Sequence, residues 1–298
     1  MNKEKILEIK NLKQYFRLNK NKVIKALDGI SLDIHEGEVL GLVGESGSGK
    51  STLGKSIVGI NKITDGEIIY DGVNISKNNK LRRKLISNSV QFIFQDSTSS
   101  LNSRMTIGDI ISEPLKIKKM CKNKNEQNEK VYEIMKLVGL NNEFIDKYPY
   151  DFSGGQRQRV AIARALSVNP KFIIADEPIA SLDVSMQAQI INLFKMLKNN
   201  GDLTCLFISH DLSMVRYISD RIAVIYKGKI VELAETEELC NNPIHPYTKS
   251  LLEAILVPTL KSNDLEMASD YKYEDEEYLS EKMKWKEIKK GHFVYGLG

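Results

Sequence analysis

The sequence has no apolar run long enough to cross a lipid bilayer. A membrane-spanning helix needs about 20 consecutive apolar residues, and residues 1–10 also lack the apolar segment of a secretory signal peptide. The 298 residues carry a formal net charge of only +4, with lysine and glutamate mixed along the chain. We therefore expect neither a membrane-spanning protein nor an extended basic surface for nucleic acid. Any role at a membrane must depend on a partner.

Cysteine is also scarce. The chain has three cysteines, Cys121, Cys205 and Cys240, which lie far apart in the sequence. An odd number at such spacing forms neither a disulfide framework nor a CxxC metal site. We expect a protein of a reducing cytoplasm that is stabilised by its core, and a hydrophobic content of 42% is ample for one.

The most specific motif that is present is a glycine-rich loop. Residues 44–52 read GESGSGKST, which matches GxxxxGK[ST], and they directly follow the apolar run 39–43. A strand, a glycine loop and a helix start in this order turn successive backbone N–H groups toward phosphate oxygens. A chance match in a chain of this length has a probability of about one in a hundred. We therefore expect a nucleotide-binding protein rather than a flexible linker.

The residue types in this loop each suit a task. Lys50 is expected to reach the β and γ phosphates, Ser51 to offer a hydroxyl to Mg²⁺, and Thr52 to add a phosphate contact. The glycines let the backbone curl at positive φ. The predicted nucleotide contacts in the loop are Gly44, Ser46, Gly47, Ser48, Gly49, Lys50, Ser51 and Thr52.

A second glycine motif precedes a later helix. Residues 152–159 read FSGGQRQR and continue into 160–166, a segment rich in small residues. A Ser-Gly-Gly sequence at a helix N-terminus directs N–H groups and the positive end of the helix dipole outward, which favours an anion. The residues concerned are Ser153, Gly154, Gly155 and Gln156. The sequence therefore predicts two helix starts suited to phosphate.

Two acidic residues follow a strand of the buried type. The apolar run 171–175 ends in Asp176 and Glu177. In an open α/β sheet, the ligand site lies at the carboxyl ends of the strands. Asp176 can hold Mg²⁺ through water, and Glu177 can orient or deprotonate the attacking water. An isolated Asp-Glu pair is more often a solvated strand end, but after two phosphate-directed motifs we favour a catalytic role.

Two further polar residues follow apolar strands. Gln95 comes directly after 90–94, and His210 comes two residues after 204–208. A lone glutamine or histidine is more often structural or solvated. A side chain at the same sheet edge as the two carboxylates can, however, reach a γ-phosphate.

The N-terminal part predicts an antiparallel hairpin. Residues 5–10 alternate as in a strand, and residues 22–34 read as two short strands broken near residue 28. Tyr15 and Phe16 lie just before the turn. Stacking on a nucleotide base and packing within a small sheet are equally good interpretations of these two aromatic residues.

Taken in order, these motifs resemble those of the ATP-binding subunits of ABC transporters. The resemblance extends from Ile6 to about Val257 and rests on six elements in that family's order: GESGSGKST, Gln95, FSGGQRQR, FIIADE, ASLD and His210. It implies an α/β fold, namely a P-loop NTPase (RecA-like) core with an antiparallel β subdomain and an inserted α-helical subdomain at about 100–165. The expected domains are an ATP-binding domain at 1–257 and a C-terminal extension at 258–298.

The resemblance also implies roles for individual residues. Gln95 would sense the metal and the water, while Asp176 and Ser51 would support Mg²⁺. Glu177 would be the catalytic carboxylate, and His210 would be the switch that contacts the γ-phosphate. The implied ligands are ATP and Mg²⁺.

In this family the hydrolysing unit is a head-to-tail pair of subunits that encloses two nucleotides. The SGGQ residues would contact ATP bound to the opposite subunit. Spacing places Phe16, rather than Tyr15, at the adenine-stacking position. Outside the glycine loop, the residues assigned to nucleotide are Phe16, Ser153, Gly154, Gly155, Gln156 and Asp183.

Three segments narrow the resemblance to the oligopeptide and dipeptide importers. They are residues 101–115, 242–252 and 285–294, and their order is most similar to the F-type ATPase subunit, which pairs with a related D-type subunit. Ser103 stands where the family usually has proline. The tail 259–298 has no cysteine, whereas many members carry a cysteine cluster that is described as an iron–sulfur site in some. We therefore expect no such cluster here.

The expected function is an ATP-hydrolysing motor subunit of a peptide importer at the cytoplasmic face of the membrane. Its expected partners are a second ATPase subunit, identical or homologous, two transmembrane permease subunits and, indirectly, an extracytoplasmic substrate-binding protein, with no nucleic acid.

Two alternatives stay open: an ATPase of the same architecture acting on nucleic acid or the ribosome, and a regulatory module without hydrolysis. The lack of an inserted coiled coil or zinc motif disfavours the first, and Glu177, His210 and an intact SGGQ disfavour the second. For the tail, a solvated appendage and a surface for a partner subunit are equally good interpretations.

Overall fold

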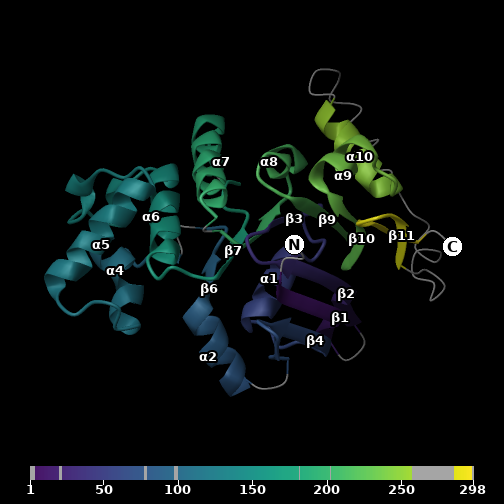
Figure 1. Cartoon of the computed structure of the whole chain (residues 1–298), viewed down its shortest axis with the longest axis horizontal. Coiled ribbons are helices and arrows are strands. Elements are labelled where there is room, and N and C mark those ends of the chain that lie inside the picture. Colours follow the sequence, from purple (N-terminus) through teal and green to yellow (C-terminus); the bar gives the residue numbers. More distant parts are fainter. Residues whose placement is uncertain are drawn as a thin grey trace. The chain divides into compact units, whose positions relative to one another are not determined.

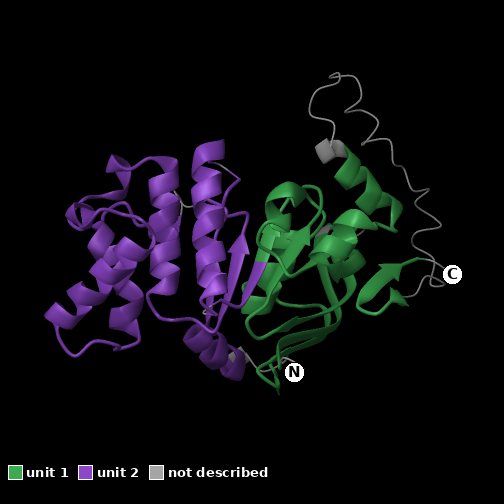
Figure 2. Ribbon diagram, turned by 45° about the horizontal axis from the view of Figure 1, so that its top comes forward, with its two compact units in different colours: residues 1–77, 207–298 green, residues 78–206 purple. Residues whose placement is uncertain are grey.

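The chain folds into two compact units. The computed structural model describes residues 4–19, 22–76, 79–96, 100–180, 182–201, 203–256 and 285–296, and Figure 1 labels its helices and strands. Residues 1–77 together with 207–298 form unit 1, and residues 78–206 form unit 2 (Figure 2). No helix in the described ranges is long and apolar enough to cross a membrane.

Unit 1 contains a four-stranded antiparallel sheet. Its strands are β1 (Lys5–Asn19), β2 (Lys22–His35), β4 (Asp65–Tyr70) and β5 (Val73–Asn74), in the order β2-β1-β4-β5. The turn between β4 and β5 is made by Asp71 and Gly72, whose φ angles are 50° and 72°. Two positive φ angles are what a two-residue type I′ hairpin requires. An Asp-Gly pair is itself a sequence signal for such a hairpin, because both residues adopt positive φ angles readily.

The strand β2 is continuous, so the predicted break near residue 28 was wrong. Gly29 lies within β2 at φ +85°, and the register of β1 with β2 shifts between the pairs Leu12↔Ile30 and Lys13↔Asp28. The irregular backbone is therefore absorbed as a bulge, which bends a strand without ending it.

A second sheet in unit 1 carries the glycine loop. In the order β11-β12-β10-β9-β3, the strand β3 runs parallel to β9 and the other neighbours are antiparallel. All residues of β3 are buried, as its apolar run predicted. The strands are β3 (Val39–Val43), β9 (Arg221–Tyr226), β10 (Lys229–Glu235), β11 (Trp285–Lys289) and β12 (His292–Tyr295). The helices of unit 1 are α1 (Lys50–Val58), α8 (Leu212–Arg216), α9 (Thr236–Asn241) and α10 (Pro246–Leu256).

The end of the chain adds two strands to this sheet. The strand β12 pairs with β10 through Glu232↔Val294 and Leu233↔Phe293, and β11 pairs with β12 on the outer side. The sequence predicted no strands here, so the interpretation of residues 285–295 as a solvated appendage was wrong. The interpretation of the tail as a surface for a partner subunit stays a prediction. Residues 257–284 of the predicted extension lie outside the described residues.

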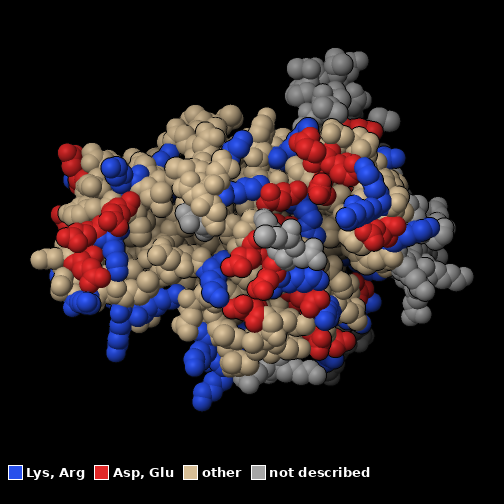
Figure 3. Space-filling model, in the orientation of Figure 1, with Lys and Arg blue, Asp and Glu red and all other residues tan. Residues whose placement is uncertain are grey.

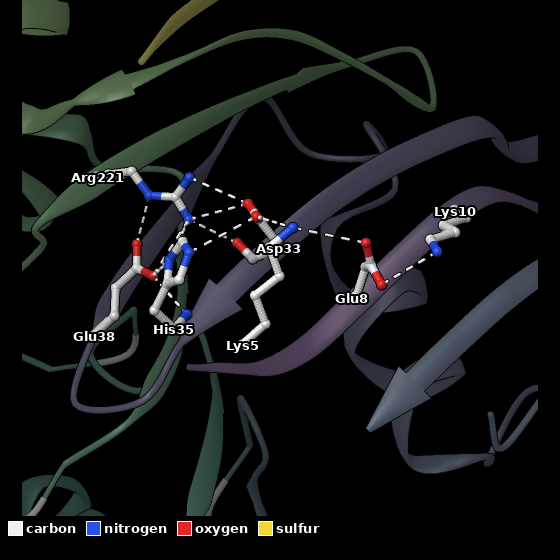
Figure 4. Close-up of polar contacts among 7 residues, drawn as sticks. All are labelled: Lys5, Glu8, Lys10, Asp33, His35, Glu38 and Arg221. Atoms are coloured by element: carbon white, nitrogen blue, oxygen red, sulfur yellow. Dashed lines mark hydrogen bonds and ion pairs between the residues drawn. The ribbon is translucent and has the colours of Figure 1, made fainter. Parts of the chain in front are cut away.

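A cluster of charged side chains connects β9 to the antiparallel sheet of unit 1 (Figure 4). The Arg221 guanidinium donates to Glu38 Oε1 at 2.7 Å through Nε and to the Asp33 carbonyl at 2.7 Å through Nη2. Lys5 Nζ lies 3.0 Å from Asp33 Oδ2. Burial alone would raise the pKa of Asp33, but Lys5 and Arg221 lower it overall. Removing Arg221 would leave the buried carboxylate of Glu38, 4% exposed, without this cation, so we expect Arg221→Ala to destabilise unit 1 by about 3 kcal/mol.

Unit 2 is largely helical. Its strands β6 (Val90–Ile93) and β7 (Phe172–Asp176) pair in parallel, and β8 (Cys205–Ser209) begins in unit 2 and ends in unit 1. The helix α6 packs against α4 and α5, and its small residues Ala161, Ala163 and Ala165 are buried. The helices are α2 (Asn79–Ser89), α4 (Ile107–Ile117), α5 (Lys124–Leu137), the 3₁₀ helices Asn142–Phe144 and Pro149–Asp151, α6 (Gly154–Leu166) and α7 (Val184–Asn199). The domain boundaries given above stay predictions.

Candidate functional site

The glycine loop joins the buried strand β3 to α1 through a tightly curled backbone. Gly47 and Gly49 have φ angles of +80° and +111°. A Cβ added to Gly44 would lie 2.2 Å from the carbonyl oxygen of Ile225, and one added to Gly49 would lie 2.5 Å from that of Ala26. Only glycine therefore fits at these positions. The N-cap of α1 is Gly49, which has no side chain to cap the first turn. The backbone N–H groups of this turn are therefore suited to bind an anion.

Lys50 brings a buried positive charge to this loop. Its side chain is only 4% exposed, and Nζ donates hydrogen bonds to the carbonyl oxygens of Gly44 at 2.7 Å and Glu45 at 2.8 Å. The ammonium group therefore lies against the start of the loop. A cation held in this position suits the negative charge of a nucleotide phosphate.

The two aromatic residues of β1 have different environments. The Tyr15 hydroxyl donates to Asp28 Oδ1 at 2.5 Å, and the Lys25 ammonium lies 5.6 Å from the ring centre. Burial, together with the hydrogen bond to Asp28, raises the pKa of Tyr15 to about 12. Phe16 is 38% exposed, and adjacent side chains of a strand point to opposite faces. Tyr15 therefore fits the packing interpretation, and Phe16 retains the predicted role of stacking on a base.

The second predicted helix start, at α6, is capped by its own side chains. The N-cap Ser153 accepts a hydrogen bond from the Gln156 N–H at 3.3 Å through Oγ, and Gln156 Oε1 accepts one from the Ser153 N–H at 3.0 Å. This is a capping box. A Cβ on Gly155 would lie 3.0 Å from Met186, so glycine lets α6 approach α7, whereas a Cβ on Gly154 would meet nothing nearer than 4.0 Å.

The predicted catalytic pair lies in unit 2. Asp176, the last residue of β7, is 2% exposed, and Glu177 follows at φ 47°. Gln95 Nε2 donates to Glu177 Oε2 at 2.9 Å, although the two residues are 82 positions apart. A carboxylate and an amide that meet at the end of a parallel strand can together orient a water molecule.

Two more predicted residues lie close to helix starts. Asp183 is the N-cap of α7 and accepts hydrogen bonds from the Ser185 hydroxyl at 2.7 Å and the Met186 N–H at 2.9 Å, which lower its pKa. His210 follows directly on β8, is exposed, and precedes Asp211, the N-cap of α8. The glycine loop and His210 belong to unit 1, whereas Gln95, Glu177 and the SGGQ residues belong to unit 2. One shared site for both sets stays a prediction.

Comparison with known families decides which kind of nucleotide protein this is. The sequence profile of the family described as "ABC transporter" matches residues 27–180, which are about half of the chain. This chain belongs to the ABC transporter family. It is an ABC-type ATPase of a transporter. A second profile, "Oligopeptide/dipeptide transporter, C-terminal region", matches residues 231–278.

Individual relatives agree with this family over nearly the whole length. The chain is 53% identical over 294 residues to the "Oligopeptide transport ATP-binding protein OppF" of Bacillus subtilis, covering 98% of this chain and 96% of the relative. It is 48% identical over 296 residues to the "Dipeptide transport ATP-binding protein DppF" of Lactococcus lactis, covering 98% and 94%. Neither match favours the alternative of an ATPase that acts on nucleic acid or the ribosome.

Solved structures of ABC cassettes have the same fold. The dimeric cassette MJ0796 in a post-hydrolysis state with ADP and Pi matches with a TM-score of 0.71 at 30% identity, covering 77% of this chain and 98% of that chain. The cbiO1 protein of Clostridium perfringens matches with a TM-score of 0.70 at 29% identity, covering 80% and 92%. The predicted P-loop ABC ATPase fold is thus confirmed.

One contact of the glycine loop was missed by reasoning from the sequence. The Glu45 N–H donates to the Tyr247 hydroxyl at 2.9 Å, across 202 positions of the chain. Tyr247 lies in the segment 242–252, which served above only to narrow the resemblance. Nothing in the sequence around Tyr247, Asn-Pro-Ile-His-Pro-Tyr, indicates which residue the hydroxyl contacts.

Proposed function

We propose that this ATPase is the motor subunit of an importer for oligopeptides or dipeptides. The observation that carries the proposal is the match of residues 231–278 to the oligopeptide/dipeptide transporter C-terminal region, beyond the cassette that all ABC ATPases share. The relatives named above, which carry oligopeptide and dipeptide transport in their names, support the same substrate class.

Glu177 acts on the attacking water. Its carboxylate accepts a hydrogen bond from the Gln95 amide at 2.9 Å, which keeps one oxygen in place. The carboxylate orients the water and takes its proton as the oxygen attacks the γ-phosphate. His210, which is exposed directly after β8, contacts the γ-phosphate. It loses this contact when the phosphate is released.

Magnesium is the expected metal of this reaction. The predicted ligands suit a hard cation, because the Ser51 hydroxyl of unit 1 and the Gln95 amide oxygen and buried Asp176 carboxylate of unit 2 are all oxygen ligands. When bound, Mg²⁺ neutralises charge on the β and γ phosphates. Asp176, at 2% exposure, is positioned by the buried strand β7 rather than by a flexible loop.

The SGGQ residues serve the nucleotide of a second subunit. Their helix start is pre-formed by the capping box of Ser153 and Gln156, so its remaining N–H groups are already oriented before a nucleotide arrives. The dimeric state of the MJ0796 cassette supports such a pair. ATP then bridges two subunits, closing the dimer, and hydrolysis removes the bridge.

The partners are a second ATPase subunit, two membrane-spanning permease subunits and, indirectly, an extracytoplasmic substrate-binding protein. The chain works at the cytoplasmic face of the membrane by binding those permeases. On the face drawn in Figure 3, acidic and basic side chains are interspersed rather than segregated, which disfavours a nucleic-acid partner.

Uptake by cells that lack the gene tests the proposal. The native gene is deleted, and uptake of a radiolabelled tetrapeptide and dipeptide is compared with uptake of a free amino acid and of Ni²⁺. Restoration of peptide uptake by the wild-type gene, but not by Glu177→Gln, is the expected result. Restored uptake of only the metal ion would contradict the peptide assignment.

Purification of the tagged chain from membranes with ATP and Mg²⁺ should yield two permeases and a second ATPase, whereas ribosomal proteins would contradict the transport assembly.

A further inference from the structure

Two sequence segments that have no part in the proposed ATP hydrolysis meet inside unit 1. They are residues 242–252, at the start of α10, and residues 285–294, in the hairpin β11–β12. Both contact one buried carboxylate on β10, that of Glu232, which is 0% exposed. A buried carboxylate is costly unless each oxygen is hydrogen-bonded.

Glu232 is bonded from both sides. Its Oε1 lies 2.7 Å from Nε2 of His292, on β12, and accepts the Ile244 N–H at 2.9 Å. Its Oε2 accepts the His245 N–H at 3.0 Å. His292 is 1% exposed and His245 is 2% exposed, so water does not compete for these bonds. The carboxylate therefore joins the C-terminal hairpin to the backbone that begins α10.

The next bond fixes the first turn of α10. The Tyr247 N–H donates to Nδ1 of His245 at 3.1 Å. Burial lowers the pKa of His245 to about 4, with Glu232 opposing this shift. The imidazole is therefore neutral at pH 7, and Nδ1 has a lone pair to accept the bond. This hydrogen bond holds the backbone from which the Tyr247 side chain extends.

Tyr247 then reaches the glycine loop. Its ring is 2% exposed and packs against Tyr226 with ring centres 4.3 Å apart, and its hydroxyl accepts the Glu45 N–H at 2.9 Å. The carbonyl of the same residue, Glu45, accepts the Lys50 ammonium at 2.8 Å. Residue 45 is thus held at its N–H by Tyr247 and at its C=O by Lys50.

We infer that Tyr247 is a positioning residue for the phosphate-binding loop, and that Glu232 and His292 hold Tyr247 in place from the C-terminal hairpin. The inference rests on the assignment of this loop to the ATP phosphates. A loop whose backbone is fixed before ATP arrives loses less conformational freedom on binding, so ATP binds more tightly. The hairpin β11–β12 therefore contributes to ATP affinity although it is not part of the nucleotide site.

Removing one hydroxyl tests the first step. In the full chain, Tyr247→Phe keeps the ring against Tyr226 and deletes only the acceptor for the Glu45 N–H. We expect amide hydrogen exchange in the peptide covering 44–50, measured without nucleotide, to become about three- to tenfold faster, and the Kd for ATP to rise by a similar factor. Tyr295→Phe is the matched control, because it deletes a hydroxyl of β12 that bonds Lys229 and lies outside this chain of contacts. Unchanged exchange and unchanged Kd in Tyr247→Phe would overturn the inference.

A double-mutant cycle tests the link to the hairpin. His292→Leu removes the side-chain partner of Glu232, whereas His292→Gln keeps a donor to it. We expect His292→Leu to raise the Kd for ATP and the exchange rate at 44–50, His292→Gln to restore both, and the effect of His292→Leu to vanish when Tyr247→Phe is already present. Additive effects would mean that the hairpin acts on the chain without Tyr247, and would overturn the link.

A reference variant separates this inference from the proposed function. If the wild-type chain binds ATP and Lys50→Ala does not, the loop assignment holds, and a null result for Tyr247→Phe counts against the positioning role alone. If the wild-type chain fails to bind ATP, the assignment of the loop fails. Exchange at residues 44–50 without nucleotide still decides then whether Tyr247 holds Glu45.

Discussion

The two glycine-containing helix starts, at α1 in unit 1 and at α6 in unit 2, differ in how their first turns are satisfied. Gly49 caps α1 without a side chain, and the cation of Lys50 lies against the loop before it. Ser153 and Gln156 cap α6 with a reciprocal pair of side-chain hydrogen bonds. The sequence predicted that both starts are suited to phosphate.

This difference suggests different tasks: the start of α1 would bind the nucleotide of its own chain, and the start of α6 would contact the nucleotide of a second subunit. The start of α1 has Lys50, its glycines and its neighbouring contacts within unit 1, so we expect it to hold phosphate without a second subunit. The start of α6 carries Arg157, whose Nε donates to the Phe152 carbonyl at 3.0 Å, but its first turn is already capped by Ser153 and Gln156 without a ligand. We therefore expect it to serve a nucleotide that another subunit holds. We therefore expect changes at α1 to affect binding by the isolated chain, and changes in unit 2 to affect hydrolysis.

The largest effect should come from Glu177 of unit 2, the proposed catalytic carboxylate. Glu177→Gln removes the proton acceptor, and we expect kcat for ATP hydrolysis to fall by about 100- to 10,000-fold while the Kd for ATP stays within about twofold. Steady-state hydrolysis and calorimetric binding measure the two quantities. The variant should also accumulate as an ATP-bound dimer on gel filtration. Hydrolysis at the wild-type rate would show that Glu177 is not the catalytic carboxylate.

A smaller effect on a different quantity is expected at α1. Lys50→Ala removes a buried charge-assisted contact, and we expect the isolated chain to bind ATP about 10- to 100-fold more weakly. Lys55→Ala, on the same helix, removes an equal charge and serves as control. The two starts would be equivalent, contrary to our interpretation, if Lys50→Ala left the Kd unchanged.

The cap of α6 gives the next effect. Ser153→Ala should cost about 1 kcal/mol of unfolding free energy and leave ATP binding by the isolated chain unchanged, while hydrolysis by the assembled dimer falls about tenfold. Thr106→Ala removes the equivalent cap of α4, where Thr106 accepts the Asp109 N–H at 3.2 Å, and should cost similar stability without changing hydrolysis. Urea denaturation and ATPase assays measure both. Equal losses of hydrolysis in the two variants would assign the effect to stability.

The smallest effect is expected at the aromatic residues of β1. Phe16→Ala should weaken ATP binding about two- to tenfold, because a stacked aromatic ring contributes about 0.5–1.5 kcal/mol. Tyr15→Phe breaks the hydrogen bond to Asp28 and should lower stability without changing the Kd. Fluorescence titration with a labelled ATP analogue measures binding. An effect at Tyr15 of this size, with none at Phe16, would reverse the assignment.

Local features of the fold were predictable because their causes are local. The Asp71-Gly72 turn needs two positive φ angles that these residue types adopt readily, and the apolar runs of β3 and β7 are buried as their composition indicates. The strands β11 and β12 were missed, since charged residues such as Lys286 and Glu287 give little strand signal. Pairing with β10 decides their conformation, and strand formation depends strongly on such context.

The sequence by itself determined the family and the glycine loop, because the motifs that carry them consist of given residue types at fixed spacing along the chain. It also predicted which residues bind ATP and act on water. Only the tertiary structure decided that Gln95 holds Glu177 and that Tyr247 holds Glu45, since these partners are 82 and 202 positions apart. It also decided which of Tyr15 and Phe16 is packed. Such contacts depend on where strands and helices end in space, which a pattern along one segment does not encode.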